Sequence, residues 1–200
     1  MKQKLKKKQK KNSSLRVLLW PRIWAVSAYR LPYREMARKG IRGLVFDVDN
    51  TLAFHDVPAD EKAVNLFNRL HRLGLEVCLL SNNKEPRVRA FAQAVDAHYV
   101  FKGGKPGIKG YQKAMKLMGT TAGDTVAIGD QLFTDILGAN RAGIYSILVT
   151  PMNPKEEIQI ILKRFLEKPI LRAYKKHHPN EPLNDWDGQK PMLPSGKKSG

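Results

Sequence analysis

Two aspartates, Asp47 and Asp49, stand two positions apart at the end of an apolar run, Leu44-Val45-Phe46. Paired carboxylates at the end of a buried strand can divide the work of covalent phosphoryl transfer. One attacks phosphorus to give an aspartyl-phosphate, and the other protonates the leaving oxygen and then deprotonates the water that hydrolyses the intermediate. We expect Asp47 to be the nucleophile and Asp49 the general acid and base.

Other polar residues follow later apolar runs in the same way. They are Ser81 and Asn82 after Cys78-Leu79-Leu80, Lys105 after Gly103-Gly104, and Asp130 after Val126-Ala127-Ile128-Gly129, with Asp135 five residues on. Taken singly, each has an ordinary explanation: a turn, a loop, a helix N-cap or a solvated helix residue. Together they mark the ends of four successive apolar segments, which favours one shared functional site.

The elements that must position these residues can be read from the middle of the chain. Short apolar runs predict strands at 44–46, 77–80, 97–101, 125–128 and 145–149, and helical periodicity predicts helices at 60–73, 85–95, 108–118 and 132–142. Apolar strands that alternate with amphipathic helices indicate an α/β fold with a central parallel sheet covered on both faces, a three-layer Rossmann-like sandwich. Ligands bind such sheets beyond the carboxyl ends of the strands, where the polar residues stand.

The motifs resemble those of the haloacid dehalogenase (HAD) superfamily. Asp47-Val48-Asp49-Asn50-Thr51 matches its first motif, Asp-x-Asp-x-Thr, and Ser81, Lys105 and Gly129-Asp130 with Asp135 match the second, third and fourth motifs in order. The resemblance implies a HAD fold and a phosphomonoester hydrolase that depends on Mg²⁺.

The resemblance also implies how substrate would be bound. Thr51, Ser81 and Asn82 would contact the substrate, with the Ser81 hydroxyl bonded to the transferring phosphoryl group. Lys105 would act in both binding and catalysis, because its charge offsets that of the phosphoryl oxygens and of the nucleophile.

A magnesium site is implied by the same motifs. Asp47, Asp130 and the backbone carbonyl of Asp49 would hold Mg²⁺, which takes few carboxylates and otherwise waters and phosphate oxygens. Asp135 would act through a metal-bound water or by orienting a direct ligand.

The spacing of the motifs predicts a site without a cap domain. Asp47 and Ser81 are 34 residues apart, and Ser81 and Lys105 are 24 apart, so one crossover helix fills each interval. A capless site is open to solvent and can accept a bulky or surface-bound phosphomonoester.

The resemblance narrows to the HAD subfamily IIIA branch called YqeG-like, which includes phosphatidylglycerophosphate phosphatases. It covers roughly 15–176, and its most specific parts are Asp49-Asn50-Thr51 and Gly129-Asp130-Gln131-Leu132-Phe133-Thr134-Asp135. A phospholipid head group is therefore the expected substrate.

Charge divides the chain of 200 residues unevenly. Its net charge is +18, and residues 1–40 contribute +12 of this, whereas residues 41–150 contribute +2. We predict a disordered polybasic tail at 1–14, a single phosphatase domain at 15–178 with an N-terminal amphipathic segment and a C-terminal helix, and a disordered tail at 179–200. Basic flanks imply a polyanionic neighbour, either an anionic membrane surface or nucleic acid.

No transmembrane helix is expected, because arginines and Pro21 interrupt the apolar segment 15–31. The lone cysteine, Cys78, suits a reducing compartment. These features predict a cytoplasmic protein that can associate peripherally with the inner face of a membrane. The segment 15–31 is expected either to contact the membrane through Trp20, Ile23, Trp24 and Tyr29 or to pack on the sheet.

Two other functions fit the sequence. One is a HAD phosphatase that acts on a soluble or nucleic-acid phosphate, since a basic tail binds RNA as well as lipid. The other is a non-catalytic RNA- or membrane-binding module that only inherited the fold. Intact Asp47, Asp49, Lys105 and Asp130 argue against this last interpretation, because binding alone requires none of them.

Overall fold

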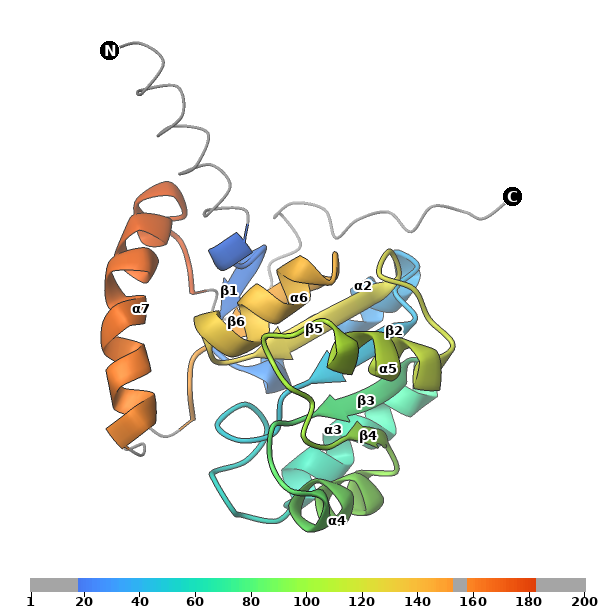
Figure 1. Cartoon of the computed structure of the whole chain (residues 1–200). Helices are drawn as coiled ribbons and strands as arrows, with labels where there is room; N and C mark the ends of the chain where they lie inside the picture. The colour runs from blue at the N-terminus through green and yellow to red at the C-terminus, as the bar shows by residue number, and fades with distance from the viewer. Residues whose placement is uncertain (1–17, 153–157, 183–200) are drawn as a thin grey trace, which may run out of the picture.

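One parallel sheet of six strands organises the protein (Figure 1). The structure is a computed structural model that describes residues 18–152 and 158–182. The strands are β1 (Ile23–Ala25), β2 (Gly43–Phe46), β3 (Glu76–Leu80), β4 (His98–Val100), β5 (Thr125–Gly129) and β6 (Tyr145–Val149), in the order β1-β6-β5-β2-β3-β4. Every neighbouring pair is parallel, so all carboxyl ends lie at one edge.

Helices cover both faces of the sheet, as the alternating sequence pattern predicts. They are η1 (Ala28–Arg30), α2 (Tyr33–Arg38), α3 (Glu61–Arg72), α4 (Glu85–Val95), α5 (Lys109–Met118), the π-turn η2 (Leu132–Ile136), α6 (Leu137–Arg141) and α7 (Ile158–His177). Leu44 and Phe46 of β2 pack in the larger core with α2, α3 and α4, whereas Val45 between them packs in a second core with α5 and α6. The three-layer α/β class is therefore confirmed.

Local sequence accounts for the ends of these helices. The Asp60 carboxylate accepts a 2.8 Å hydrogen bond from the backbone N–H of Ala63 and caps α3. Gly119 ends α5 with a φ of 64°, a conformation that glycine adopts without strain.

The central strand is β2, which lies between β3 and β5. Phe46 is in register with Leu79 on one side and with Ile128 on the other. The chain runs from β2 to one neighbour through α3 and returns much later to the other, so the strand order reverses at β2. A crevice opens at such a switch point, and the residue that follows Phe46 is Asp47.

Two features of the local structure were not predicted. Part of the amphipathic N-terminal segment forms β1, which pairs with β6 through Ile23 and Ile147. The expected helix at 132–142 begins with a π-turn, in which the Ile136 N–H donates to the Gln131 carbonyl at 3.2 Å. Both features depend on partners distant in sequence or on the site itself.

The described part of the 15–31 segment packs on the protein. Ile23 is buried, and the Tyr29 hydroxyl donates a 2.5 Å hydrogen bond to the Leu52 carbonyl. The Trp20 ring meets Tyr174 of α7 edge-on, with centroids 5.4 Å apart. Packing is thus the better of the two interpretations of this segment.

The C-terminal part of the described chain is hydrogen-bonded to strand β1, at the side of the sheet. Buried Glu181 accepts hydrogen bonds from the backbone N–H of Trp24 at 2.7 Å and from the Tyr174 hydroxyl at 2.6 Å. The tails expected at 1–14 and, beyond position 182, at 179–200 lie outside the described residues, and the domain limits stay predictions. Among the described helices none is long and apolar enough to cross a membrane.

A close backbone contact at Gly110 supports the loop that carries Lys105. A Cβ at position 110 would lie 2.4 Å from the Gly103 carbonyl oxygen and 2.9 Å from Leu80 Cδ1. Overpacking typically costs about 1–3 kcal/mol, which exceeds the helix-propensity gain of about 1 kcal/mol from alanine.

We therefore expect Gly110→Ala to lower the melting temperature, by about 2–4 °C for each kcal/mol of net destabilisation. Gly123→Ala is the matched control, because the nearest atom to its Cβ is 3.8 Å away. Equal melting temperatures for the two variants in thermal unfolding would contradict this account.

Candidate active site

The carboxyl ends of β2 and β5 bring two aspartates side by side. Asp47 directly follows β2, and its backbone N–H donates to the Ile128 carbonyl of β5 at 2.9 Å. Asp130 directly follows β5. Adjacent strands thus join residues that are far apart in sequence.

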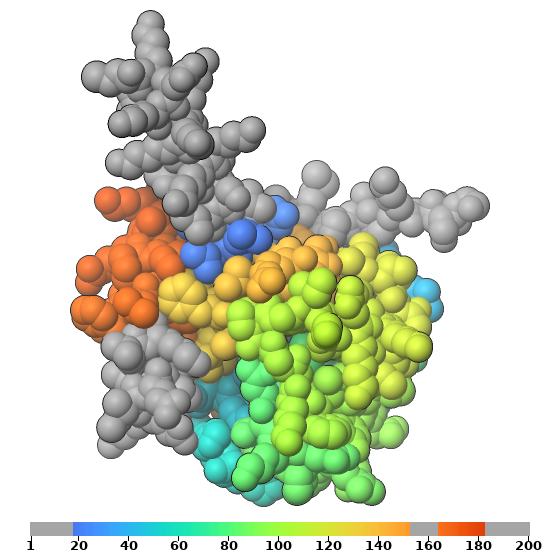
Figure 2. All heavy atoms as spheres, in the orientation of Figure 1, coloured from blue at the N-terminus to red at the C-terminus, as the bar shows by residue number. Residues whose placement is uncertain are grey.

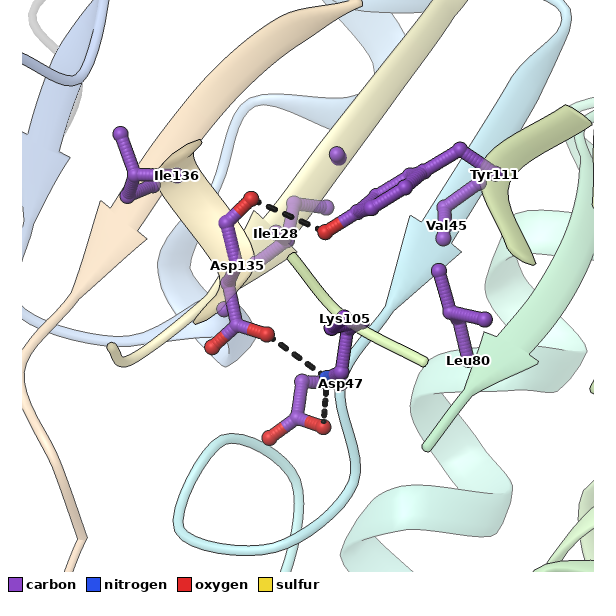
Figure 3. A pocket seen from close by; sticks show the side chains of 10 residues that line it. Val45, Asp47, Leu80, Lys105, Tyr111, Ile128, Asp135 and Ile136 are labelled. Atoms are coloured by element: carbon purple, nitrogen blue, oxygen red, sulfur yellow. Dashed lines mark hydrogen bonds and ion pairs between the residues drawn. The ribbon is translucent and has the colours of Figure 1, made fainter. Parts of the chain in front are cut away.

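Lys105 links Asp47 to Asp135 (Figure 3). Its Nζ donates to Asp47 Oδ1 at 2.5 Å and to Asp135 Oδ1 at 2.6 Å. The side chains of Lys105 and Asp135 are 5% and 6% exposed, and that of Asp47 is 11% exposed. The ammonium group therefore pairs with two carboxylates at once, and all three side chains are largely shielded from water.

The π-turn and a glycine position Asp135. A Cβ at Gly129 would lie 2.5 Å from the Asp135 Cβ, so only glycine permits this approach. The Asp135 carboxylate accepts a 3.0 Å hydrogen bond from the Gln131 N–H, and its carbonyl accepts a 2.9 Å bond from the Tyr111 hydroxyl.

Asn82 contacts the backbone of Lys105. Its side-chain oxygen accepts from the Lys105 N–H at 2.8 Å, and its amide nitrogen donates to the Lys105 carbonyl at 3.1 Å. Ser81 is buried, and its hydroxyl oxygen accepts a 3.1 Å bond from the Asn83 N–H. Asn82 therefore fixes the loop that carries the cation.

Asp49 has its own set of polar partners, and its carboxylate lies outside the cluster of Asp47, Asp130 and Asp135. Asn83 Nδ2 donates to its Oδ2 at 2.9 Å, and Arg87 Nη2 donates to its Oδ1 at 3.3 Å. His55 Nδ1 lies 3.5 Å from the same Oδ1. These partners come from the loop before α4, from α4 and from the loop after β2.

Sequence reasoning missed Arg164 on α7. Its guanidinium donates to the Asp130 carboxylate, and its Nη1 also donates to the Asp130 carbonyl at 2.5 Å. The neighbouring Glu167 accepts a 2.7 Å bond from the Leu132 N–H. Thr51 completes the contacts of Asp130, with its hydroxyl 3.2 Å from Oδ1. No motif marks Arg164, because its role depends on how α7 docks.

Comparison with known proteins places this site in a family. The family model described as "haloacid dehalogenase-like hydrolase" matches residues 53–143. The "Probable phosphatase YqeG" of Bacillus subtilis is 31% identical over 163 residues, which cover 81% of this chain and 95% of the relative. The chain belongs to the haloacid dehalogenase-like hydrolases. The family and the class of enzyme, a phosphoric monoester hydrolase, are as the motifs predicted.

More distant relatives of this hydrolase were also found. The chloroplastic/mitochondrial phosphatidylglycerophosphate phosphatase 1 of Arabidopsis thaliana is 24% identical over 176 residues, which cover 80% of this chain and 49% of the plant protein. The chain thus spans about half of that relative. A cobalt-bound deoxy-D-mannose-octulosonate 8-phosphate phosphatase from Haemophilus influenzae has a TM-score of 0.45 and 18% identity, over 70% of this chain and 92% of that one.

Burial and like charges shift the ionisation of the clustered groups. Burial raises the pKa of Asp47 well above its usual range, and Asp135 and Asp130 add to the rise against the opposing effect of Lys105. Burial and then Asp135 raise the pKa of Asp130 to about 7, despite Arg164. Burial alone would lower the pKa of Lys105, but Asp135 and Asp47 outweigh it and raise the pKa above its usual range.

The hydrolase's carboxylates fit a hard divalent cation. One oxygen each of Asp47, Asp130 and Asp135 lies within 4.8 Å of the others. An all-oxygen set suits Mg²⁺, and a cation there would offset the repulsion that raises the pKa of Asp47. The Asp49 carboxylate is not among the three.

The raised pKa of Asp130 would make the binding of a metal at this site depend on pH. The folded carboxyl keeps a proton up to a pH of about 7, whereas an unfolded aspartate loses it near about 4. In metal-free protein, the stability that this raised pKa contributes therefore falls as pH rises through that window. Because Mg²⁺ competes with the same proton, it should stabilise the protein more at higher pH.

We expect the rise in melting temperature on replacing EDTA with Mg²⁺ to be larger at pH of about 8 than at about 6, as followed by tryptophan fluorescence. Asp130→Asn should abolish the difference between the two pH values. A shift that is equal at both, or larger at the lower pH, would contradict the site.

Proposed function

We propose that this hydrolase is a Mg²⁺-dependent phosphatase that acts through an aspartyl-phosphate on Asp47, with phosphatidylglycerophosphate at a membrane surface as its substrate. The observation that carries the proposal is the buried Lys105 bridge between Asp47 and Asp135, at the switch point of the sheet. The names of the Bacillus and Arabidopsis relatives support the reaction and the lipid, respectively.

In the first step an Asp47 oxygen attacks phosphorus. The new oxygen–phosphorus bond forms as the bond from phosphorus to the leaving oxygen breaks, and the leaving oxygen takes a proton from Asp49. In the second step water attacks the aspartyl-phosphate, Asp49 takes the water's proton, and inorganic phosphate leaves with Asp47 regenerated. Lys105 holds Asp47 in place for the attack and offsets charge on the phosphoryl oxygens, as an ammonium already within 2.5 Å of the nucleophile can do.

The metal would be held by Asp47 and Asp130, with the Asp49 carbonyl as a further ligand and Asp135 acting on the ligands or on a bound water. Mg²⁺ would supply Lewis-acid neutralisation of the phosphoryl charge. Thr51 and Arg164 keep the Asp130 carboxylate oriented, since they bond to its two oxygens.

Asp49 is oriented by its own partners. Asn83 and Arg87 donate to different oxygens of its carboxylate, which limits its rotation. We assign Asn83 and Arg87 as positioning residues for the general acid and base. Ser81 and Thr51 are proposed to contact the phosphoryl group, and Asn82 acts through the Lys105 backbone that it holds.

The site has no inserted domain above it in the first two crossovers. Residues 47–81 contain α3 and β3, and residues 81–105 contain α4 and β4, so a single helix lies in each interval. A substrate whose remainder stays in a bilayer needs this openness. The same openness would admit a phosphorylated sugar or the phosphate end of a nucleic acid, to which the net charge of +18 is equally complementary.

The test is to assay purified protein with Mg²⁺ against phosphatidylglycerophosphate in vesicles, a phospho-sugar and a 3′-phosphorylated oligonucleotide. We expect the lipid to have the highest kcat/KM, and Asp47→Asn to fall below about one thousandth of wild type because it removes the nucleophile and a metal ligand together. If the oligonucleotide is hydrolysed in preference to the lipid, the substrate is a nucleic-acid phosphate and the lipid proposal is wrong. Binding of RNA or vesicles without any hydrolysis would mean a non-catalytic module.

Asp49→Asn separates the two aspartates. It should keep Mg²⁺ binding, measured as a Mg²⁺-dependent rise in melting temperature, because the backbone carbonyl remains. Turnover should fall by about 10²–10⁴-fold, the usual contribution of general acid–base catalysis. A loss of less than about tenfold would assign proton transfer to another group.

A further inference from the structure

Large apolar side chains are exposed mainly around the site. Six are exposed within the described residues: Phe54, Val57, Ile108, Leu117, Phe165 and Leu166. Single exposed apolar residues are ordinary on a protein surface, so their distribution is the informative property. Five of the six lie in segments that reach the carboxyl edge of the sheet, and Leu117 does not.

Two of these residues follow the general acid and base. Phe54 and Val57, 45% and 41% exposed, lie in the loop after Asp49. The Phe54 carbonyl accepts a 3.4 Å hydrogen bond from Arg87, which also contacts Asp49. This loop is therefore fixed to the site, with its apolar side chains in solvent.

Two more lie beside Arg164 on α7. Phe165 and Leu166 are 66% and 54% exposed, whereas Arg164 reaches Asp130. Figure 1 shows α7 and the loop after β2 on the side toward which the strands point. In Figure 2 the atoms of α7 form one flank of the molecule, beside the segment that contains η2 and α6.

Ile108 belongs to the same edge, three residues after Lys105, whereas Leu117 lies at the far end of α5. Nine residues of helix separate them, which is about 14 Å along the axis. We call Phe54, Val57, Ile108, Phe165 and Leu166 the apolar rim.

Cations accompany the rim. Lys168, Arg172, Lys175 and Lys176 are exposed on α7, where Glu167 is the acidic residue among positions 164–177 and is buried. Lys84 and Lys102, also exposed, lie in the loops that follow Asn83 and Phe101. Exposed Asp56 is the opposing charge in the Phe54 loop.

We propose that the apolar rim docks the hydrolase on an anionic lipid bilayer and presents Asp47 to phosphomonoesters at its surface. The inference rests on the proposed lipid substrate and assigns the surface that reaches it. Apolar side chains enter the boundary between head groups and acyl chains, while adjacent lysines and arginines meet lipid phosphates. The aromatic residues of β1 and its flanks are packed on the protein, so we assign membrane contact to the apolar rim instead.

The experiment measures binding to vesicles of phosphatidylcholine and phosphatidylglycerol. The full chain carries Asp47→Asn, so that binding is measured without turnover. At about 1 M salt the Debye length is about 3 Å, and the apolar part of binding dominates. Phe165→Ser with Leu166→Ser, and separately Phe54→Ser with Val57→Ser, should each weaken co-sedimentation at least tenfold, which is about 1.4 kcal/mol.

Leu117→Ser is the matched control, because its side chain is 42% exposed and lies away from the site. It should change binding less than about twofold. The proposal is overturned if the parent protein ignores vesicles, if both double variants bind as the parent does, or if Leu117→Ser loses as much. It is also overturned if the rim variants leave vesicle binding intact and instead dissociate an oligomer in size-exclusion chromatography.

The wild-type chain separates this proposal from the proposed function. If the rim residues are needed for vesicle binding but phosphatidylglycerophosphate is not hydrolysed, the docking surface is supported and the proposed substrate is wrong. If the lipid is hydrolysed but vesicle binding does not need the rim residues, the proposed substrate is supported and the docking surface is wrong. If both proposals are correct, the rim variants should have a lower ratio of turnover on vesicles to turnover on a soluble phosphomonoester. Leu117→Ser should leave this ratio unchanged.

Discussion

A single ammonium group holds the centre of this protein together. Lys105 donates to Asp47 and Asp135 in a region nearly closed to solvent, where unpaired carboxylates would suffer both lost hydration and mutual repulsion. The surrounding structure serves this contact. Asn82 fixes the Lys105 backbone from both sides, Gly129 leaves space for Asp135, and the parallel pairing of β2 with β5 sets Asp47 beside Asp130. These supports come from the ends of β2, β3 and β5.

Charge balance connects that contact to catalysis. With every group ionised, the cations Lys105 and Arg164 face four carboxylates, those of Asp47, Asp130, Asp135 and Glu167, which leaves two net negative charges. A divalent cation would offset both charges and remove the repulsion that a phosphate dianion would otherwise meet in the same space. The arrangement is therefore suited to binding a metal and a phosphate together, and less suited to either alone.

The positions of most site residues could be predicted from the sequence, for a physical reason. Strand ends carry their own local signal, an apolar run followed by a turn, so Asp47, Ser81, Lys105 and Asp130 could be assigned to one edge without any knowledge of contacts. Strand β1 could not be predicted, because three residues beside a proline give no periodicity and are held by β6.

Arg164 and the π-turn could not be predicted from the sequence for a related reason. The partner of Arg164 lies 34 residues away, and the link depends on the docking of a whole helix. The π-turn follows from the need to bring Asp135 against Gly129, which no local propensity records. Likewise, Arg87 is an ordinary helix residue by sequence, and only the fold brings it to Asp49.

Strand β1 has a consequence for the order in which the chain becomes structured. It is the earliest described strand, yet its partner β6 is more than 120 residues later, and the bond from Trp24 to Glu181 spans 157 residues. A ribosome that has completed β2 to β5 has therefore produced the central layers and most of the site while β1 still has no neighbour. Its apolar side chains remain uncovered until nearly the entire chain has emerged. The earliest strand among the described residues is thus the last to find its partner, and distant pairing of this kind slows folding and favours aggregation before folding is complete.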